Sequence, residues 1–305
     1  MNPADIKKSL GAGILAAPDV YEAILTRQIK SKDLGIKQST LSHWRKEGLF
    51  IHEKDFEKHE HIRFSFVEYV WLNIIAELRK YDVALRVIRS IKEILTYKIL
   101  LSELMEDFNI NELANKKLPE DIAREVQNLL HEPETIKQAE KSIEYNALIA
   151  LIQDSIIYKT QLSLMVNSAG ESHAFRSDMI EQLLDDEELR VFLQKTFISV
   201  SISEIITRYL KVADLKFCSG KLQLISDREA EVLQILRDKK ISSMTIQLGD
   251  NNAIQLIELE EEYNRIEKEA RLIDFIIKNG YQTIELKTEN GNIVHCKNLR
   301  KIKFD

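Results

Sequence analysis

The stretch Ser31-Lys-Asp-Leu-Gly-Ile-Lys-Gln-Ser-Thr-Leu-Ser-His-Trp44 has the layout of two short helices joined by a tight turn. Gly35 is the predicted hinge, because a turn between steeply packed helices favours a residue that adopts positive φ without a Cβ penalty. Leu34 and Ile36 flank this glycine and are expected to face the core. The stretch therefore predicts a helix-turn-helix.

The second helix of the pair has one apolar and one polar face. Leu41 and Trp44 lie three residues apart and point to the core, and Gln38 or Ser39 is the expected N-cap. The other face carries short hydrogen-bonding and cationic side chains, which reach phosphates and base edges when a helix enters the major groove. These are Lys37, Ser39, Thr40, Ser42, His43 and Arg45. A surface helix with a polar face is the alternative for this segment taken alone.

The residues that follow favour the first interpretation. Gly48 ends the second helix, and a charged stretch runs from residue 51 to residue 60. Ser65 with Glu68 then forms a capping box that begins a new helix. Its apolar residues recur at helical spacing and bury one face: Phe66, Val67, Val70, Trp71, Ile74, Ile75 and Leu78. A further helix carries Leu85, Ile88, Ile91 and Leu95.

This order of elements resembles the DNA-binding domain of the MerR family of bacterial regulators. In that family a GV-x-x-x-TL-x-[YH]-[WY]-x-x-x-GL segment is followed by a wing, an aromatic-Ser pair, a helix ending in LR and an L-x-x-I helix. The matching residues are Gly35-Ile36, Thr40-Leu41, His43-Trp44, Gly48-Leu49, Phe64-Ser65, Leu78-Arg79 and Leu85 with Ile88. The resemblance covers roughly a quarter of the chain and implies a winged helix-turn-helix head that binds double-stranded DNA.

The resemblance also implies a set of DNA-binding residues. The leading contacts are Thr40, His43, Arg45 and Arg63. The plausible additions are Lys37, Gln38, Ser39 and Ser42.

The chain departs from the family pattern at four positions. Ser42 replaces the arginine usual after Thr-Leu, and Ile62 replaces the usual wing arginine, with Arg63 one position later. Phosphate contacts are therefore expected to be weaker or shifted. Ser31 replaces a usual alanine and Asp82 a usual glycine, and neither change is expected to break the fold.

MerR-like proteins are dimers that bind pseudo-palindromic sites. A homodimer is expected here too, because one small head buries too little DNA surface for tight specific binding. Apolar spacing continues at Ile99, Leu100 and Leu104, which predicts a short dimer helix from Thr96 to Phe108.

The charge of the chain is unevenly distributed. With 305 residues, 44% hydrophobic and 30% charged, it suits two or three folded, helix-rich domains. The net charge of -6 alone argues against a nucleic-acid binder. However, residues 1–100 hold 17 Lys and Arg against 13 Asp and Glu, a net of +4, and the remainder holds 26 against 36, a net of -10. A basic head and an acidic body mildly support contact between the head and a polyanion.

The expected fold is mainly α with an α+β C-terminal part: a winged helix-turn-helix head, a helical linker and a mixed α+β effector or interaction region. The expected divisions are an N-terminal arm (1–24), the head (25–95), a helical linker or dimerisation segment (96–145), a middle α+β or helical domain (146–225) and a C-terminal α+β domain with two hairpins (226–305).

Within the body, residues 147–166 favour strands with a turn at Gln153-Asp154, a helix being the alternative, and residues 178–210 favour a helix. The C-terminal part alternates helices and hairpins. Its expected elements are a helix capped by Ser226 with Glu229 and ending at Leu236, strands 241–248 and 253–259, a charged helix 260–278 closed by Gly280, and strands 281–287 and 293–297 joined at Asn290-Gly291. The basic tail 297–303 is interpreted as a solvated strand end, with a second nucleic-acid contact as the alternative.

No catalytic residue, metal site or cofactor is predicted. His52, His59 and His61 lie among glutamates in the expected wing, at no standard ligand spacing. Cys218 and Cys296 are far apart without a CxxC, and no cysteine lies near the dimer helix, where metal-sensing members of the family carry theirs. No common nucleotide-binding or hydrolase motif occurs, and His295 next to Cys296 would point to the opposite face of a strand. An enzyme is not expected.

The sequence therefore predicts a sequence-specific transcription regulator with double-stranded DNA as its partner and a body that senses an unidentified effector or protein partner. No stretch approaches the ~20 apolar residues of a membrane span. The N-terminus is a poor signal peptide, so no membrane partner and a cytoplasmic location are expected. A non-enzymatic architectural or protein-interaction factor that keeps the head as a scaffold is the alternative, motivated by the missing arginines at positions 42 and 62.

Overall fold

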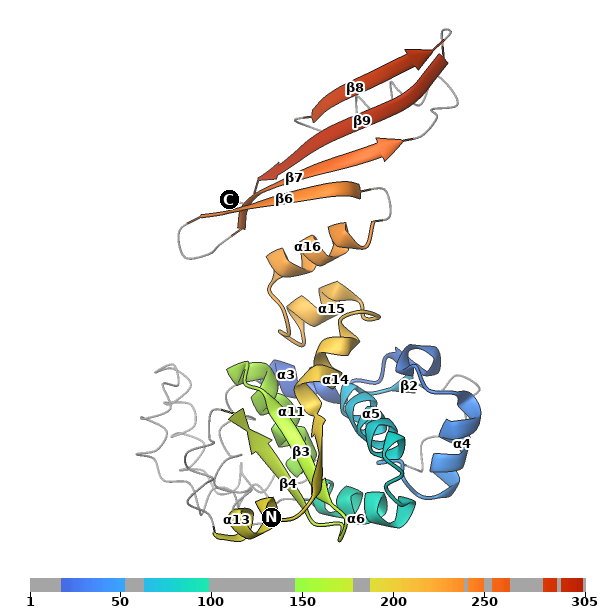
Figure 1. Ribbon diagram of the computed structural model, residues 1–305, viewed down its shortest axis with the longest axis vertical. Helices are drawn as coiled ribbons and strands as arrows, with labels where there is room; N and C mark the ends of the chain where they lie inside the picture. Colours follow the sequence, from blue (N-terminus) through green and yellow to red (C-terminus); the bar gives the residue numbers. More distant parts are fainter. Residues whose placement is uncertain are drawn as a thin grey trace. The chain divides into compact units, whose positions relative to one another are not determined.

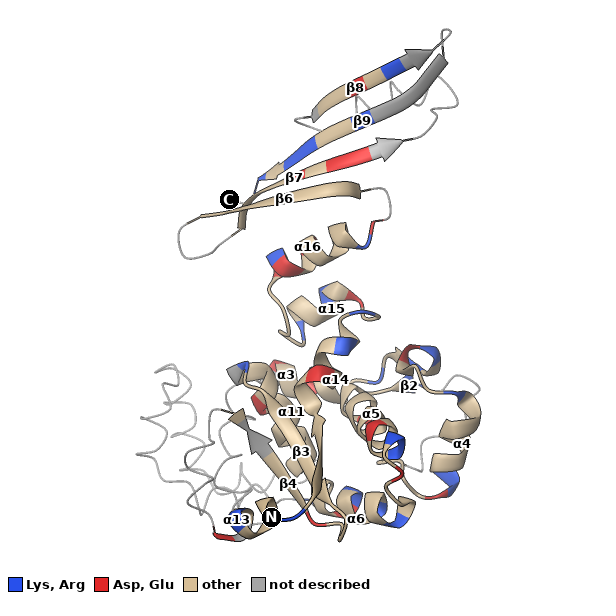
Figure 2. Cartoon of the chain, in the orientation of Figure 1, with Lys and Arg blue, Asp and Glu red and all other residues tan. Residues whose placement is uncertain are grey.

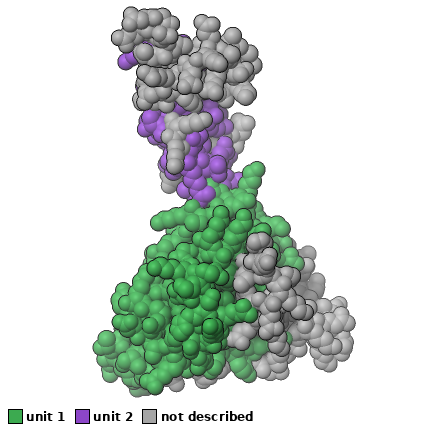
Figure 3. Space-filling view, turned by 90° about the vertical axis from the view of Figure 1, so that its right-hand side faces the viewer, with its two compact units in different colours: residues 1–224 green, residues 225–305 purple. Residues whose placement is uncertain are grey.

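The computed structural model describes residues 18–52, 63–98, 146–177, 187–238, 241–249, 254–263, 282–289 and 292–303 (Figure 1). The chain divides into two compact units, Met1–Leu224 and Ile225–Asp305, which Figure 3 colours separately.

The head is helical with one short strand pair. Its elements are α3 (Pro18–Leu25), β1 (Ile29–Lys30), the 3-10 helix η1 (Ser31–Leu34), α4 (Gln38–Lys46), β2 (Arg63–Phe64), α5 (Phe66–Lys80) and α6 (Leu85–Leu95). The predicted helix-turn-helix and both later helices are confirmed. The sequence places residues 18–24 in an N-terminal arm, whereas they form a helix that packs on α5, with Val20 and Ile24 fully buried.

Helix α5 lies at the centre of the first unit. The predicted capping box begins it: the backbone N–H of Glu68 donates to Ser65 Oγ at 3.2 Å, and the N–H of Ser65 donates to Glu68 Oε2 at 2.8 Å. Trp71, Ile74 and Ile75 have no exposed surface. Because the helix is apolar on most of its circumference, it contacts α3, α11, α14 and β5 as well as η1.

The rest of the first unit is a small antiparallel sheet with helices. Its elements are α11 (Ala147–Tyr158), β3 (Leu162–Asn167), β4 (Ser172–Arg176), α13 (Glu187–Leu193), β5 (Phe197–Ser201), α14 (Ile202–Tyr209) and α15 (Leu215–Gly220). The strand order is β4-β3-β5.

Two predictions for this region are wrong, and a third, the dimer helix 96–108, is wrong at its start and otherwise lies outside the described residues. Residues 147–158 form a helix, not strands: Asn146 caps it, accepting from the N–H of Ile149 at 3.0 Å, and burial on all sides removes the amphipathic signal. Residues 197–201 form strand β5 because they pair with β3, although the sequence favours a helix there. Helix α6 ends at Leu95, so the predicted dimer helix does not continue it directly, and residues 99–108 lie outside the described part of the chain.

The head packs directly on this sheet region. The Tyr209 ring on α14 lies against the rings of Phe66 and Tyr69 on α5, with centroids 5.0 and 4.9 Å apart. Beside them Arg208 Nη2 donates to Glu77 Oε1 at 2.7 Å. Burial alone would raise the pKa of Glu77, but hydrogen bonds from Lys80 and Arg208 outweigh it and leave the pKa below its ordinary value. Head and sheet therefore share one core.

The second unit is a sheet with one described helix. Its elements are α16 (Asp227–Leu236), β6 (Ile241–Leu248), β7 (Ile254–Tyr263), β8 (Gln282–Glu289) and β9 (Asn292–Lys303). All strand pairs are antiparallel in the order β6-β7-β9-β8, which confirms both predicted hairpins. Ile235 of α16 packs on Ile257 and Leu259 of β7.

The charged segments of this unit form strands. Residues 260–263 extend β7, so the predicted helix 260–278 is wrong at its start, and residues 264–278 are outside the described ranges. The basic tail is part of β9, where Lys297 pairs with Glu260 at 2.8 Å and Lys301 with Glu258 at 2.6 Å. These cross-strand ion pairs agree with a solvated strand and engage two of the cations that a second nucleic-acid contact would need. Among the residues described, no helix is both long and apolar enough to span a bilayer.

Candidate nucleic-acid interface

Helix α4 turns its polar side to solvent. Leu41 and Trp44 are buried, with 3% and 5% of their surface exposed. The predicted contact residues on this helix remain accessible: Lys37, Gln38, Ser39, Ser42 and His43 are exposed, and Thr40 and Arg45 are half-buried. Figure 2 shows lysine or arginine at both ends of α4 and uncharged residues between them. Helix α4 and its N-cap residue thus bring together all the predicted contacts except Arg63.

The turn before α4 has the predicted glycine geometry but a different cap. Gly35 has φ 69° and ψ 11°, and a Cβ there would meet no atom within 4 Å, so only the backbone conformation requires glycine. Lys37, rather than Gln38 or Ser39, is the N-cap, and no side chain caps the helix. The N-cap side chain therefore accepts from none of the first N–H groups of α4, an arrangement that suits a phosphate oxygen.

The other end of α4 is fixed by α6. Arg89 donates from Nε and Nη2 to the carbonyl oxygen of Glu47 at 3.1 and 2.7 Å. Lys92 Nζ donates to the carbonyl oxygen of Gly48 at 2.5 Å. Cations at a helix C-terminus satisfy its last carbonyl groups. Sequence reasoning missed both residues, because their partners lie more than 40 positions away. The one local indication that they act together is their spacing of three residues, which places both on the same side of α6.

A buried carboxylate fixes the base of the predicted wing. Glu68 Oε1 lies 3.0 Å from Arg27 Nη2 and 3.4 Å from His52 Nδ1. Trp71 Nε1 donates to the carbonyl oxygen of Leu49 at 2.7 Å. These contacts connect both the segment before β1 and the segment after α4 to α5. Most of the predicted wing falls in residues 53–62, which are outside the described ranges.

A second cationic position lies on the strand pair. Arg63 on β2 is directly opposite Lys30 on β1, and both are exposed. Arg63 Nη1 also donates to the carbonyl oxygen of Gln28 at 3.1 Å. Like charges on opposed strand positions destabilise the pair, and a bound phosphate would relieve that repulsion. Lys30 was not among the predicted contacts, because its pairing with Arg63 appears only in the structure.

The histidines of the wing do not form a described site. His59 and His61 lie outside the described residues, and His52 contacts Glu68. In the part of the chain that the structure describes, no three His, Cys, Asp or Glu side chains are placed to hold a metal ion.

Comparison with known proteins agrees with this geometry. Residues 31–94, which run from η1 into α6, match the family model described as MerR HTH family regulatory protein. The head is MerR-like. No curated protein and no solved structure matches the chain. One departure from the family pattern now has a physical explanation: Asp82 has φ 57°, a left-handed conformation that glycine adopts freely and that Asp tolerates better than most residues.

Arg89→Ala is expected to weaken DNA binding by the MerR-like head about tenfold, since hydrogen bonds from a charged donor contribute about 1.5 kcal/mol. Without them the end of α4 is less firmly placed against α6. Amide hydrogen exchange of residues 47–49 should become faster in the same variant, with no DNA present. Faster exchange together with lower affinity would show that Arg89 positions the end of α4. Lower affinity alone would show only the loss of its charge.

Arg86→Ala is the matched control, because Arg86 is an exposed arginine on the same helix. It removes the same charge and should leave amide exchange of residues 47–49 unchanged. If both variants lost the same affinity and neither changed exchange of residues 47–49, Arg89 would not position the end of α4.

Proposed function

We propose that the protein is a transcription regulator that binds a specific pseudo-palindromic site in double-stranded DNA as a homodimer. The observation that carries the proposal is α4, which exposes a polar and cationic face on a rigid MerR-like head. A helix of this composition fits the major groove, where donors and acceptors on base edges distinguish the base pairs.

The side chains of the head divide into two roles. Thr40, His43 and Arg45 on α4 are assigned to base edges and nearby phosphates. Arg63 and Lys30 on the strand pair are assigned to the flanking backbone, because they present two adjacent positive charges without base-specific geometry. Lys37, Gln38, Ser39 and Ser42 complete the contact surface around the start of α4.

The remaining parts of the proposal concern the body. We assign residues 96–145 to dimerisation or a helical linker, and residues 146–305 to sensing an effector or protein partner, with no catalytic step. A cytoplasmic location follows from the proposed role, since the DNA of a bacterial cell lies there. The net negative charge of residues 101–305 favours the head as the DNA-binding part.

Salt dependence tests the phosphate contacts. The logarithm of the binding constant for a bound DNA fragment should fall linearly with the logarithm of the salt concentration, with a slope of about 0.9 per neutralised phosphate. Arg63→Ala and Lys30→Ala should each reduce that slope by about one. Fluorescence anisotropy across a salt series measures it.

Lys211→Ala, at an exposed position after α14, is the control and should leave the slope unchanged. The same slope for all four proteins would remove β1 and β2 from the proposed interface. No preference for genomic fragments over random duplex would instead favour an architectural or interaction factor.

A further inference from the structure

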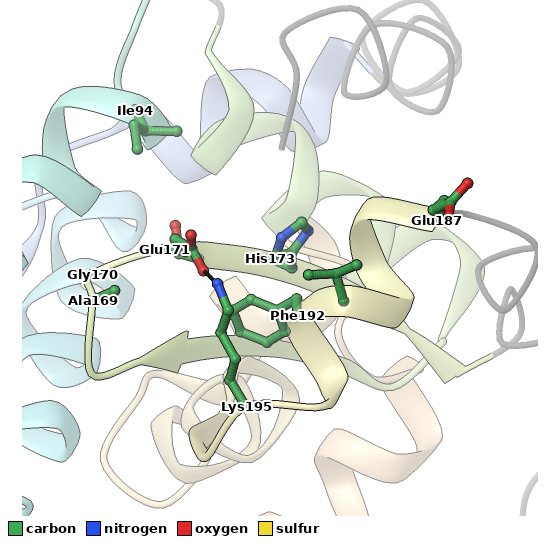
Figure 4. Close-up of a pocket in the computed structure, with 10 residues that line it drawn as sticks. Ile94, Ala169, Gly170, Glu171, His173, Glu187, Phe192 and Lys195 are labelled. Atoms are coloured by element: carbon green, nitrogen blue, oxygen red, sulfur yellow. Dashed lines mark hydrogen bonds and ion pairs between the residues drawn. The ribbon is translucent and has the colours of Figure 1, made fainter.

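A cavity of about 590 Å³ opens between α6, the turn that joins β3 to β4, and α13 (Figure 4). Its volume lies within the range of about 300–1,000 Å³ typical of small-molecule sites. Ile94 comes from α6, Gly170 and Glu171 from the turn, and Val191 and Phe192 from α13. All of these residues belong to the first unit.

One side of the cavity is apolar. Ile94 and Val191 are 43% and 50% exposed, which is unusual for large aliphatic side chains that face a concave surface. Phe192 is buried, and its ring meets the His173 ring edge-on with centroids 4.5 Å apart. An apolar ligand body would cover the aliphatic surface of Ile94 and Val191 that is now open to water.

The other side of the cavity carries nitrogen donors. Lys195 Nζ donates to Glu171 Oε2 at 2.7 Å, and Glu171 also accepts from Asn167 Nδ2 at 2.5 Å. Figure 4 shows Lys195 and Glu171 pointing toward one another, His173 projecting between Ile94 and α13, and Glu187 pointing away. Because Asn167 can keep Glu171 in place, Lys195 is able to donate to a second carboxylate. Lys195 and His173 then bind the acid group while the apolar side binds the rest of the molecule.

The cavity is in contact with the helix that fixes α4. On α6, Val87 and Ile94 lie seven residues apart and share one flank, whereas Arg89 and Lys92 lie on the opposite flank. The β3–β4 turn touches the first flank so closely that a Cβ on Gly170 would lie 3.2 Å from Val87 Cγ1. The second flank binds the carbonyl oxygens of Glu47 and Gly48, which directly follow α4. A displacement of the turn or of Ile94 would therefore reach the end of α4 through the contacts of one helix.

We propose that this cavity binds a small carboxylic acid with an apolar body, and that its occupancy changes DNA binding by moving α6 against α4. The first half stands on the cavity alone. The second half rests on the proposed function, because it needs a head that binds DNA.

Calorimetric titration of the full-length protein without DNA tests the ligand site. The probes are phenylacetate and octanoate, with phenethylamine and octylamine as amines of similar shape. Saturable binding of the acids is expected, weakened at least tenfold by Lys195→Met. Binding of the amines in preference to the acids would overturn the proposed ligand class, and no binding of either acid would overturn the site.

Val191→Trp and Val212→Trp form a matched pair, since the two valines are 50% and 51% exposed and only Val191 lines the cavity. Val191→Trp should fill the cavity, abolish acid binding and change DNA affinity at least fivefold. Val212→Trp should change neither. Acid binding that leaves DNA affinity unaltered in the wild type would overturn the coupling. If the wild type bound no specific DNA, the proposed function would fail, while calorimetry would still decide the ligand site.

Discussion

Replacing Thr40, His43 and Arg45 together with alanine is expected to weaken specific DNA binding at least a hundredfold. Each base or phosphate contact of this kind contributes about 1–3 kcal/mol, so three lost contacts amount to at least ~3 kcal/mol, or about a hundredfold in Kd. The three side chains lie on the accessible side of α4, away from the buried Leu41 and Trp44. Mobility shifts on DNA upstream of the protein's own gene measure the loss.

The fold should survive this triple substitution, because none of the three side chains is part of the buried core. The far-ultraviolet circular dichroism spectrum and the midpoint of thermal unfolding should therefore match the wild type. Lys211→Ala combined with Lys216→Ala, two exposed cations of the body, is the charge-loss control. A triple variant that bound the same DNA as tightly as the wild type would remove α4 from the interface.

Glu68→Ala is expected to lower the free energy of unfolding of the first unit by about 3 kcal/mol. The substitution removes the reciprocal half of the capping box, worth about 1 kcal/mol, and the carboxylate partner of Arg27 in a site of low exposure, worth about 2 kcal/mol. Urea unfolding followed by tryptophan fluorescence measures this free energy of unfolding, since both tryptophans of the chain, Trp44 and Trp71, lie in the head.

The comparison variants make the result specific. Glu93→Ala removes an exposed carboxylate from α6 and should leave the urea midpoint nearly unchanged. Glu68→Gln keeps an oxygen acceptor for the N–H of Ser65. Its urea midpoint should lie between those of Glu68→Ala and Glu93→Ala. Equal midpoints for Glu68→Ala and Glu93→Ala would mean that the contacts of Glu68 do not stabilise the head.

The head could be predicted from the sequence because its determinants are local. Gly35 marks a left-handed turn that favours glycine, and Ser65 with Glu68 three residues later marks a helix start. The apolar residues of α5 and α6 recur at helical spacing. The contacts that place α4 could not be predicted in this way. Arg89 and Glu47 are 42 residues apart, and only the packing of α6 brings them together.

The body was predicted less well because its elements depend on burial and pairing. The apolar run 147–152 favours a strand by propensity, yet Asn146 begins a helix there and the surrounding core buries every side. Residues 197–201 are a strand only because β3 provides a partner. The cavity at α13 joins residues from three separate segments of the sequence, so no local pattern could indicate it.

Selection of bound fragments from sheared genomic DNA, followed by sequencing, tests the central claim most directly. The full-length wild-type protein should enrich a small set of fragments that share one motif with two-fold symmetry. The triple variant of Thr40, His43 and Arg45 should enrich none of them. Recovery of fragments in proportion to their abundance, or the same enriched set with both proteins, would contradict the account of a DNA-reading α4.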